Sequence, residues 1–138
     1  MTCRCLLVTN NSKFVPRVSS IEMLKTSLDV LVRSRDLVHQ GNRLLTHPLC
    51  GNLRPYQQPF RSVLIEMNPQ ADPAKVDPWS LELIENALSV YRSCQDRLLE
   101  PGFLSRQAED DCALLDLELM NKSLEEHHMF AQDHSDRS

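Results

Sequence analysis

Hydrophobic residues along the chain occur as short continuous runs and as longer stripes with helical spacing. The run Leu-Leu-Val at 6–8 is too short for a helix and is followed by polar turn formers, which predicts a buried strand over residues 4–9. The run Val-Leu-Ile within residues 60–67 predicts another strand. Residues 18–23 are compatible with a strand or with the first turns of a helix, and we favour a strand there.

Three stripes with a period near 3.6 residues predict helices over residues 27–40, 78–99 and 106–124. The first follows Thr26, which has Asp29 three residues later in a capping-box pattern, and Gly41 provides its C-cap. The second starts at Asp77 and Pro78, an N-cap acid followed by proline at the first helical position. These local signals fix where the first two helices begin.

The last predicted helix carries many acidic residues, and its apolar positions are expected to face inward. These positions are Ala108, Cys112, Leu115, Leu119 and Met120. The acids at 109–111, 116 and 118 are then expected to face mostly outward. From 125 to 138 the sequence lacks periodicity, which indicates a frayed or disordered tail.

The order of these elements indicates the fold class. We expect residues 1–124 to form a single α/β domain with a small, mostly parallel sheet of two or three strands covered by helices. The chain length of 138 residues fits one domain. The pairing order of the strands does not follow from the sequence. A homodimer through the last two helices is compatible with the pattern but not required by it.

Composition places the chain among ordinary soluble proteins, with 41% hydrophobic and 25% charged residues. No apolar run approaches the roughly 20 residues of a membrane span, and the N-terminus lacks the features of a secretory signal. A cytoplasmic location is therefore expected, with the five cysteines as reduced thiols. An aromatic content of 5% makes a nucleic-acid partner a poor expectation.

Positive charge is concentrated in one irregular stretch between Arg33 and Arg61. Five arginines against Asp36 give that stretch a formal charge of +4, which leaves −8 for the rest of a chain whose net charge is −4. Residues 41–59 are predicted to be loop, since three prolines and two glycines fall there, and loops of such length are usually functional. The asymmetry points to a small anionic ligand, a carboxylate or a phosphate.

His47 is the candidate acid–base group of this loop. Pro48 holds it in an extended conformation, and Asp36 and His39 are near it in sequence. The alternative is that His47 bonds the loop backbone and merely fixes the loop. Both interpretations remain open at this point.

Other chemistries have weaker support. Cys3, Cys5, Cys50 and the pair at 127–128 do not form a zinc-finger pattern, so no metal is predicted. Cys50 as a nucleophile is a minor alternative. No phosphate-binding or dinucleotide fingerprint is present, and no cofactor is predicted.

Several motifs resemble one known family. They are LVTNN at 7–11, VRSRDLVHQGNRLLTHPLCGN at 32–52, PFRSVL at 59–64 and SLELIENAL at 80–88. Over roughly residues 6–120 the chain is similar to the GrdX family, small proteins encoded beside the glycine and betaine reductases of amino-acid-fermenting bacteria. The resemblance implies a role near those reductases, whose subunits become candidate partners, but implies no reaction or cofactor. The N-terminal Cys3-Arg4-Cys5 and the histidine-bearing tail depart from the family pattern.

Three functional hypotheses follow from the sequence. The first is an accessory protein that binds a small anion through loop 41–61. The second is an enzyme that uses His47 as general acid or base with help from Asp36 or Thr46. The third is an interaction module that docks on an acidic partner. The predicted ligand-binding residues are Thr9, Asn10, Asn11, Arg35, His39, Arg43, Thr46 and Arg54.

Overall fold

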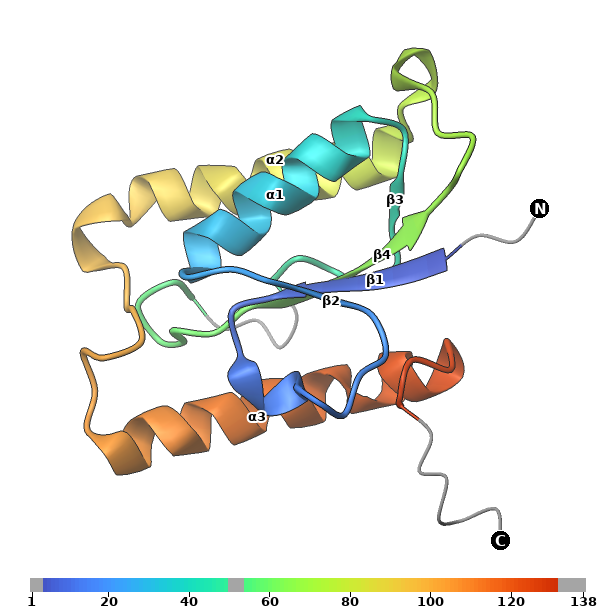
Figure 1. Ribbon diagram of the computed structural model, residues 1–138. Coiled ribbons are helices and arrows are strands. Elements are labelled where there is room, and N and C mark those ends of the chain that lie inside the picture. The colour runs from blue at the N-terminus through green and yellow to red at the C-terminus, as the bar shows by residue number, and fades with distance from the viewer. Residues whose placement is uncertain (1–3, 50–53, 132–138) are drawn as a thin grey trace, which may run out of the picture.

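The computed structural model describes residues 4–49 and 54–131 (Figure 1). Its strands are β1 (Arg4–Thr9), β2 (Ile21–Met23), β3 (Arg43–Leu44) and β4 (Ser62–Met67). Its α-helices are α1 (Ser27–His39), α2 (Pro78–Ser93) and α3 (Arg106–Glu126). Short 3₁₀ helices occur at η1 (Ser12–Phe14), η3 (Pro73–Lys75) and η4 (Gln95–Arg97). The expected α/β class is confirmed.

The four strands form one mixed sheet in the order β2-β1-β4-β3. β1 runs parallel to β2, whereas β4 runs antiparallel to both of its neighbours. The prediction of a mostly parallel sheet with two or three strands is therefore wrong in strand direction and in number. The strand expected over 18–23 is present but shorter, as β2.

The segment predicted to be loop over 41–59 contains the strand that changes the topology. β3 has two residues, too few to produce a periodic signal, and it pairs antiparallel with β4. The chain therefore returns from β3 to β4 as a hairpin with a long connection. Antiparallel neighbours require no crossover helix, so β4 enters the sheet in the direction opposite to β1.

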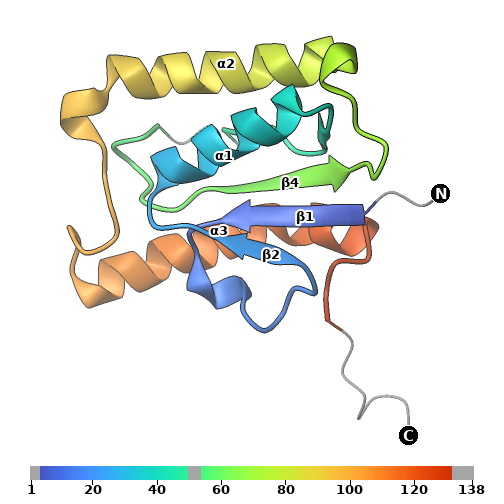
Figure 2. The ribbon, with the colours of Figure 1, turned by 45° about the horizontal axis from the view of Figure 1, so that its top comes forward.

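Side chains of the two central strands alternate between two buried faces. Leu7 pairs with Leu64, and both belong to the hydrophobic cluster that includes Met120 of α3. Val8 pairs with Val63, and both pack in the cluster under α1 and α2. Figure 2 shows α1 and α2 on one side of the sheet and α3 on the other. The continuous apolar runs of β1 and β4 follow from burial on both faces.

The predicted starts of the first two helices are confirmed. Thr26 caps α1, and it forms the reciprocal capping box with Asp29. Gly41 follows the C-cap of this helix with φ +103°, a conformation that favours glycine. Asp77 caps α2, where its carboxylate accepts from the backbone N–H of Ser80, and Pro78 occupies the first turn.

The inward face of α3 differs from the predicted one. Its buried residues are Ala113, Asp116, Met120 and Leu124. Leu115, expected inside, is 40% exposed, whereas Asp116, expected outside, is 6% exposed. The prediction assumed that acids avoid the core, but Asp116 finds hydrogen-bond donors beneath the helix, and these compensate for its burial.

The prediction of a frayed tail from residue 125 is wrong for residues 125–131. α3 continues to Glu126, and Met129 is buried in the cluster under this helix. The backbone N–H of Ser19 donates to the carbonyl of Met129, and Phe130 forms a bridge with Val18. A single turn after α3 thus brings one apolar side chain back to the core, a contact that periodicity does not reveal. Residues 132–138 lie outside the described part of the chain.

Candidate functional site

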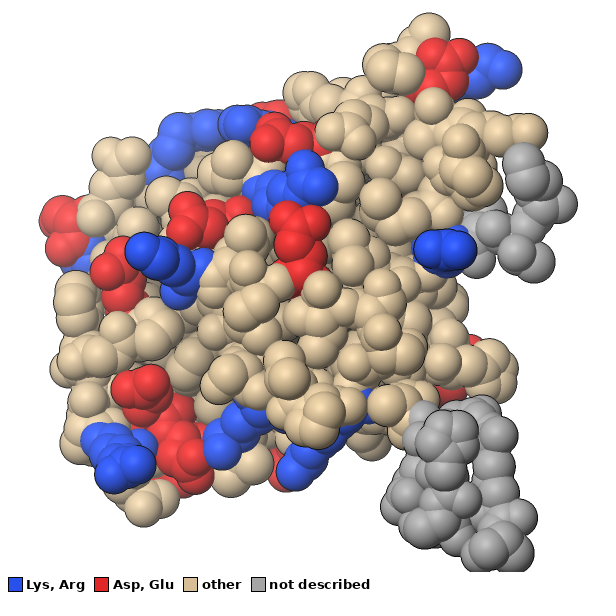
Figure 3. Space-filling view, in the orientation of Figure 1, with Lys and Arg blue, Asp and Glu red and all other residues tan. Residues whose placement is uncertain are grey.

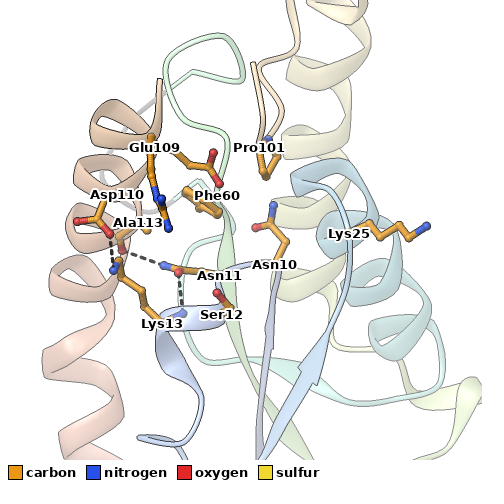
Figure 4. A pocket seen from close by; sticks show the side chains of 11 residues that line it. Asn10, Asn11, Ser12, Lys13, Lys25, Phe60, Pro101, Glu109, Asp110 and Ala113 are labelled. Atoms are coloured by element: carbon orange, nitrogen blue, oxygen red, sulfur yellow. Dashed lines mark hydrogen bonds and ion pairs between the residues drawn. The ribbon is translucent and has the colours of Figure 1, made fainter. Parts of the chain in front are cut away.

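A cleft of about 440 Å³ opens at the carboxyl end of β1, between the start of α1 and the first half of α3 (Figure 4). It is lined by Asn10, Asn11, Ser12, Lys13, Lys25, Phe60, Pro101, Arg106, Glu109, Asp110 and Ala113. Ends of strands are where α/β folds place binding groups. Two of the residues predicted from the sequence, Asn10 and Asn11, therefore line a cleft.

The two asparagine side chains tie separate segments together at the bottom of this cleft. The Asn10 amide nitrogen donates to the carbonyl of Pro59 at 2.8 Å, and its oxygen accepts from the backbone N–H of Arg61 at 2.9 Å. The Asn11 amide nitrogen donates to the carbonyl of Ala113 at 2.8 Å and to Asp116 Oδ2 at 3.1 Å. The cleft thus has a floor whose polar groups are fixed by hydrogen bonds.

A chain of hydroxyl groups runs beneath that floor. Ser62 Oγ donates to Asp116 Oδ2 at 2.7 Å. Because a hydroxyl has one hydrogen, the 2.7 Å contact between Thr9 Oγ1 and Ser62 Oγ is donated by Thr9. Thr9 Oγ1 in turn accepts from the backbone N–H of Asn11 at 3.0 Å. The network joins β1, β4 and α3, and it ends on one buried carboxyl group.

Burial raises the pKa of the Asp116 carboxyl above its ordinary value. Hydrogen bonds from Ser62 and Asn11, and the charge of Arg61, act in the opposite direction. We expect desolvation to prevail because Asp116 is only 6% exposed, on the face of α3 that packs against β4. Asp116 is therefore a buried carboxyl group with a raised pKa, one layer below the cleft.

The side chain of Arg61 points into the protein interior and does not contribute to the surface of the loop between β3 and β4. Its side chain is 2% exposed, and Nε donates to the hydroxyl of Tyr91 at 3.0 Å. The guanidinium carbon also lies 5.8 Å from the centre of the Tyr91 ring, within cation–π range. One of the five arginines of the basic segment is therefore a core residue packed against Tyr91.

The rim of the cleft carries charges of both signs. Lys13 Nζ lies 2.6 Å from Asp110 Oδ1, so these two charges neutralise each other. In the part of the chain that the structure describes, the side chains of Lys25, Arg106 and Glu109 take part in no ion pair or hydrogen bond. Arg106 and Glu109 are therefore available to a ligand in the cleft, whereas Lys25 points toward its outer rim (Figure 4).

Two of the arginines predicted to bind a ligand, Arg35 and Arg43, have acidic partners of their own. Arg35 contacts Asp36 at 3.3 Å, and Arg43 Nε contacts Glu66 Oε1 at 3.3 Å. Arg54 is exposed, and its backbone N–H donates to Gln57. On the face that Figure 3 shows, basic and acidic side chains are interspersed rather than gathered in one patch.

The sheet register separates Arg43 from the residues at the end of β1. Thr9 pairs with Ser62 at one end of β4, while Arg43 pairs with Glu66 at the other end. Four residues of extended strand correspond to about 13 Å. The register thus separates Arg43 from Thr9, Asn10 and Asn11, which the sequence predicted as ligand-binding residues together with it.

His47 makes a contact with the loop backbone of the kind that the alternative interpretation expects. It is exposed, and Nδ1 accepts from the backbone N–H of Leu49 at 3.0 Å. Thr46 is buried, and its hydroxyl accepts from the backbone N–H of Leu64 at 3.0 Å. These contacts hold the connection between β3 and β4 in place.

The remaining predicted residues lie on the outer side of α1. Asp36 is exposed, and its carboxylate contacts Arg35. His39 is exposed and lies 3.8 Å from Glu85 of α2. None of the hydrogen bonds or ion pairs between described residues joins His47 to either of them.

No group of three or more His, Cys, Asp or Glu side chains among residues 4–49 and 54–131 has a geometry that could hold a metal ion. No helix in those ranges is long and apolar enough to cross a membrane. Cys3 and Cys50, which the sequence raised as candidates, lie outside the described residues.

Sequence reasoning missed the residues that build the cleft and the network below it. Ser62 is a buried polar residue at the start of an apolar strand and Asp116 a buried acid among the exposed acids of α3. Glu109 was expected to face solvent, and Arg106 carried no signal. One signal was present: Ala113, Asp116 and Met120 have helical spacing. Including Asp116 in the buried stripe would have predicted the correct inward face of α3.

Comparison with known proteins places the chain in a family. Curated proteins and solved structures gave no match to the chain. A family model described as GrdX-like protein matches residues 6–125, which include all of the strands and α-helices except the first two residues of β1 and the last residue of α3. The chain belongs to the GrdX-like protein family.

Proposed function

We propose that the protein is an accessory protein of amino-acid reductase metabolism, of the glycine and betaine reductase type, that binds a small anion such as a carboxylate or phosphate. The resemblance to the GrdX family supports the metabolic setting, and reductase subunits are then the proposed protein partners. The anion site is the cleft at the end of β1. It replaces the site expected in loop 41–61.

One observation carries this proposal. Lys25 and Arg106 line the cleft, and neither is in an ion pair or a side-chain hydrogen bond within the described residues. Arginine meets carboxylate or phosphate with two parallel hydrogen bonds, so Arg106 is the principal anion contact. Arg43, by contrast, already has Glu66 as a partner.

The burial of the polar network favours binding over catalysis. Ser62 is 3% exposed and Asp116 is 6% exposed, so neither reaches a molecule in the cleft. Asn10 and Asn11 use their amides to hold the floor. A catalytic group must lie within hydrogen-bond reach of the reacting atoms, and these groups support the cleft from below instead.

A thermal-shift experiment with a matched pair of variants tests the proposal. Phosphate, sulfate or acetate should raise the melting temperature beyond chloride at equal ionic strength, because a ligand that binds the native state stabilises it by mass action. Arg106→Ala should abolish that increment. Arg43→Ala is the matched control, and this variant should keep the anion-specific rise in melting temperature.

Two results would contradict the proposed function. If Arg43→Ala lost the anion-specific rise in melting temperature and Arg106→Ala kept it, the anion site would lie near Arg43 and not in the cleft. The absence of any anion-specific increment in the wild-type chain would mean that the cleft does not bind anions. Arg106 is exposed at the first position of α3 and alanine is a good helix former, so the fold should survive the test substitution.

A further inference from the structure

Lys13 and Asp110 pair with each other, and the other charged residues that line the cleft include both cations and an anion. Figure 4 shows the Glu109 side chain extending from α3 toward Phe60, on the inner side of the cleft. The same view shows Lys25 directed away from Asn10, toward the outer rim. The interior of the cleft is therefore not uniformly positive. A simple anion placed there meets a carboxylate as well as a cation.

Arg106 and Glu109 are neighbours on one face of α3. Residues three apart on a helix have Cβ atoms about 5–6 Å from each other. Both residues line the cleft, and within the described chain neither side chain has a bonding partner. A cation and an anion are thus presented side by side toward the same space.

An ion pair between Arg106 and Glu109 themselves is the competing explanation. The six ion pairs among the described residues do not include it. Arg106 is exposed, and a pair at a solvent-exposed position is weak because water screens it and two long side chains lose freedom. A ligand that satisfies both groups at once can therefore displace such a pair.

Resting on the proposed function, we propose that the ligand of the cleft is a zwitterion, a small α-amino acid. Its carboxylate binds Arg106, and its ammonium group binds Glu109. One carbon atom joins the two charged groups of an α-amino acid, so they can reach neighbouring side chains on one helix face. Phe60 and Pro101 also line the cleft and offer apolar surface to the side chain of such a ligand.

Glu109 is then the residue that determines specificity. It repels a molecule that carries only a carboxylate, and it attracts one that also carries an ammonium group. A hydrogen bond to a charged group is typically strong enough to change affinity about tenfold or more. The difference between an amino acid and its deaminated analogue therefore measures what Glu109 contributes.

Isothermal titration calorimetry on the full chain provides the test with three matched probes. Alanine carries both charged groups, propionate lacks the ammonium group and ethylamine lacks the carboxylate. Alanine should bind the wild-type chain at least about tenfold more tightly than either analogue. The variants are Glu109→Gln and Arg106→Gln, with Glu118→Gln as a matched control on an exposed position of α3.

Each variant has its own expected effect. Glu109→Gln should weaken the binding of alanine about tenfold, and propionate should bind this variant as tightly as the wild type or more tightly. Arg106→Gln should weaken alanine and propionate together. Glu118→Gln should change neither. These three results, taken together, would assign the carboxylate to Arg106 and the ammonium group to Glu109.

The outcomes also separate this inference from the proposed function. If propionate or phosphate binds as tightly as alanine and Glu109→Gln does not change their ratio, the zwitterion inference is overturned and the anion site stands. If alanine affinity is unchanged in Arg106→Gln, both the ligand placement and the anion site are wrong. If none of alanine, propionate and phosphate binds, both proposals fall.

Discussion

Replacing Asp116 with asparagine tests whether the carboxyl beneath the cleft is held neutral. Asp116 accepts hydrogen bonds from Ser62 and Asn11, and burial raises its pKa above the ordinary value of 3.8. Asparagine carries no charge and keeps an oxygen that accepts both hydrogen bonds. The substitution therefore removes the titration of this site while it retains most of the packing.

The sign of the pH dependence follows from proton binding. A carboxyl with a raised pKa keeps its proton in the folded chain at pH values where the unfolded chain has lost it. The folded state then binds more protons, so the free energy of unfolding decreases as pH rises from 3.8 through the raised pKa. The contribution of Asp116 is fully present below that window and is lost above it. Within the window the slope can reach about 1.4 kcal/mol per pH unit.

Urea unfolding followed by far-UV circular dichroism measures the effect between about pH 4 and pH 8. The difference between wild type and Asp116→Asn cancels carboxylates that titrate alike in both chains. Relative to the variant, the wild type should be most stable at the acid end and should lose that advantage as pH rises. Asp116→Ala should cost about 1–3 kcal/mol even at the acid end, because the Ser62 hydroxyl loses its acceptor.

A difference that increases with pH would refute this reasoning. It would mean that Arg61 and the two hydrogen bonds hold the carboxylate ionised and that its pKa is lowered. A difference that does not change with pH would show that Asp116 titrates alike in the folded and unfolded chains. Either result would remove desolvation as the dominant influence on this group.

Three further predictions concern the scaffold and are read from melting temperature or urea midpoint. Ile84→Ala in α2 should cost about 2–5 kcal/mol because a fully buried side chain leaves a cavity; an unchanged melting temperature would contradict its place in the core. Met129→Ala should cost an amount in the same range of about 2–5 kcal/mol, whereas a frayed tail would give no effect. Gly41→Ala should destabilise more than Gly102→Ala, since a Cβ at Gly41 would lie 2.5 Å from the backbone nitrogen of Asp72 and one at Gly102 meets nothing within 4 Å. Equal destabilisation by the two substitutions would show that the backbone near Asp72 moves to accommodate the added Cβ.

Features with local causes could be predicted from the sequence. The capping box of Thr26 and Asp29 and the cap at Asp77 depend on residues within one helical turn, and both are confirmed. The apolar runs of β1 and β4 are long enough to be recognised. Direction in the sheet was not predictable in the same way, because it depends on β3, whose two residues leave no pattern.

The site was harder to predict because its residues come together only in three dimensions. The cluster of arginines is real in sequence, but Arg43 has Glu66 as a partner and Arg61 lies against Tyr91, both distant along the chain. Net charge in a segment says nothing about such partners. Asn10 and Asn11, predicted from their place after a strand, do line a cleft, since β1 ends where it opens. Lys25 and Arg106 carried no comparable signal.

The most direct test of the central claim is an amide ¹H–¹⁵N chemical-shift titration of the full chain with alanine and with phosphate. It shows where a ligand binds without requiring that its affinity be high. If the cleft is the site, shifts should be concentrated at Asn11, Lys13, Arg106 and Glu109, while Arg43 stays unchanged. Shifts concentrated at Arg43, Arg54 and His47, with Arg106 and Glu109 unchanged, would contradict the account and place the site in the loop between β3 and β4.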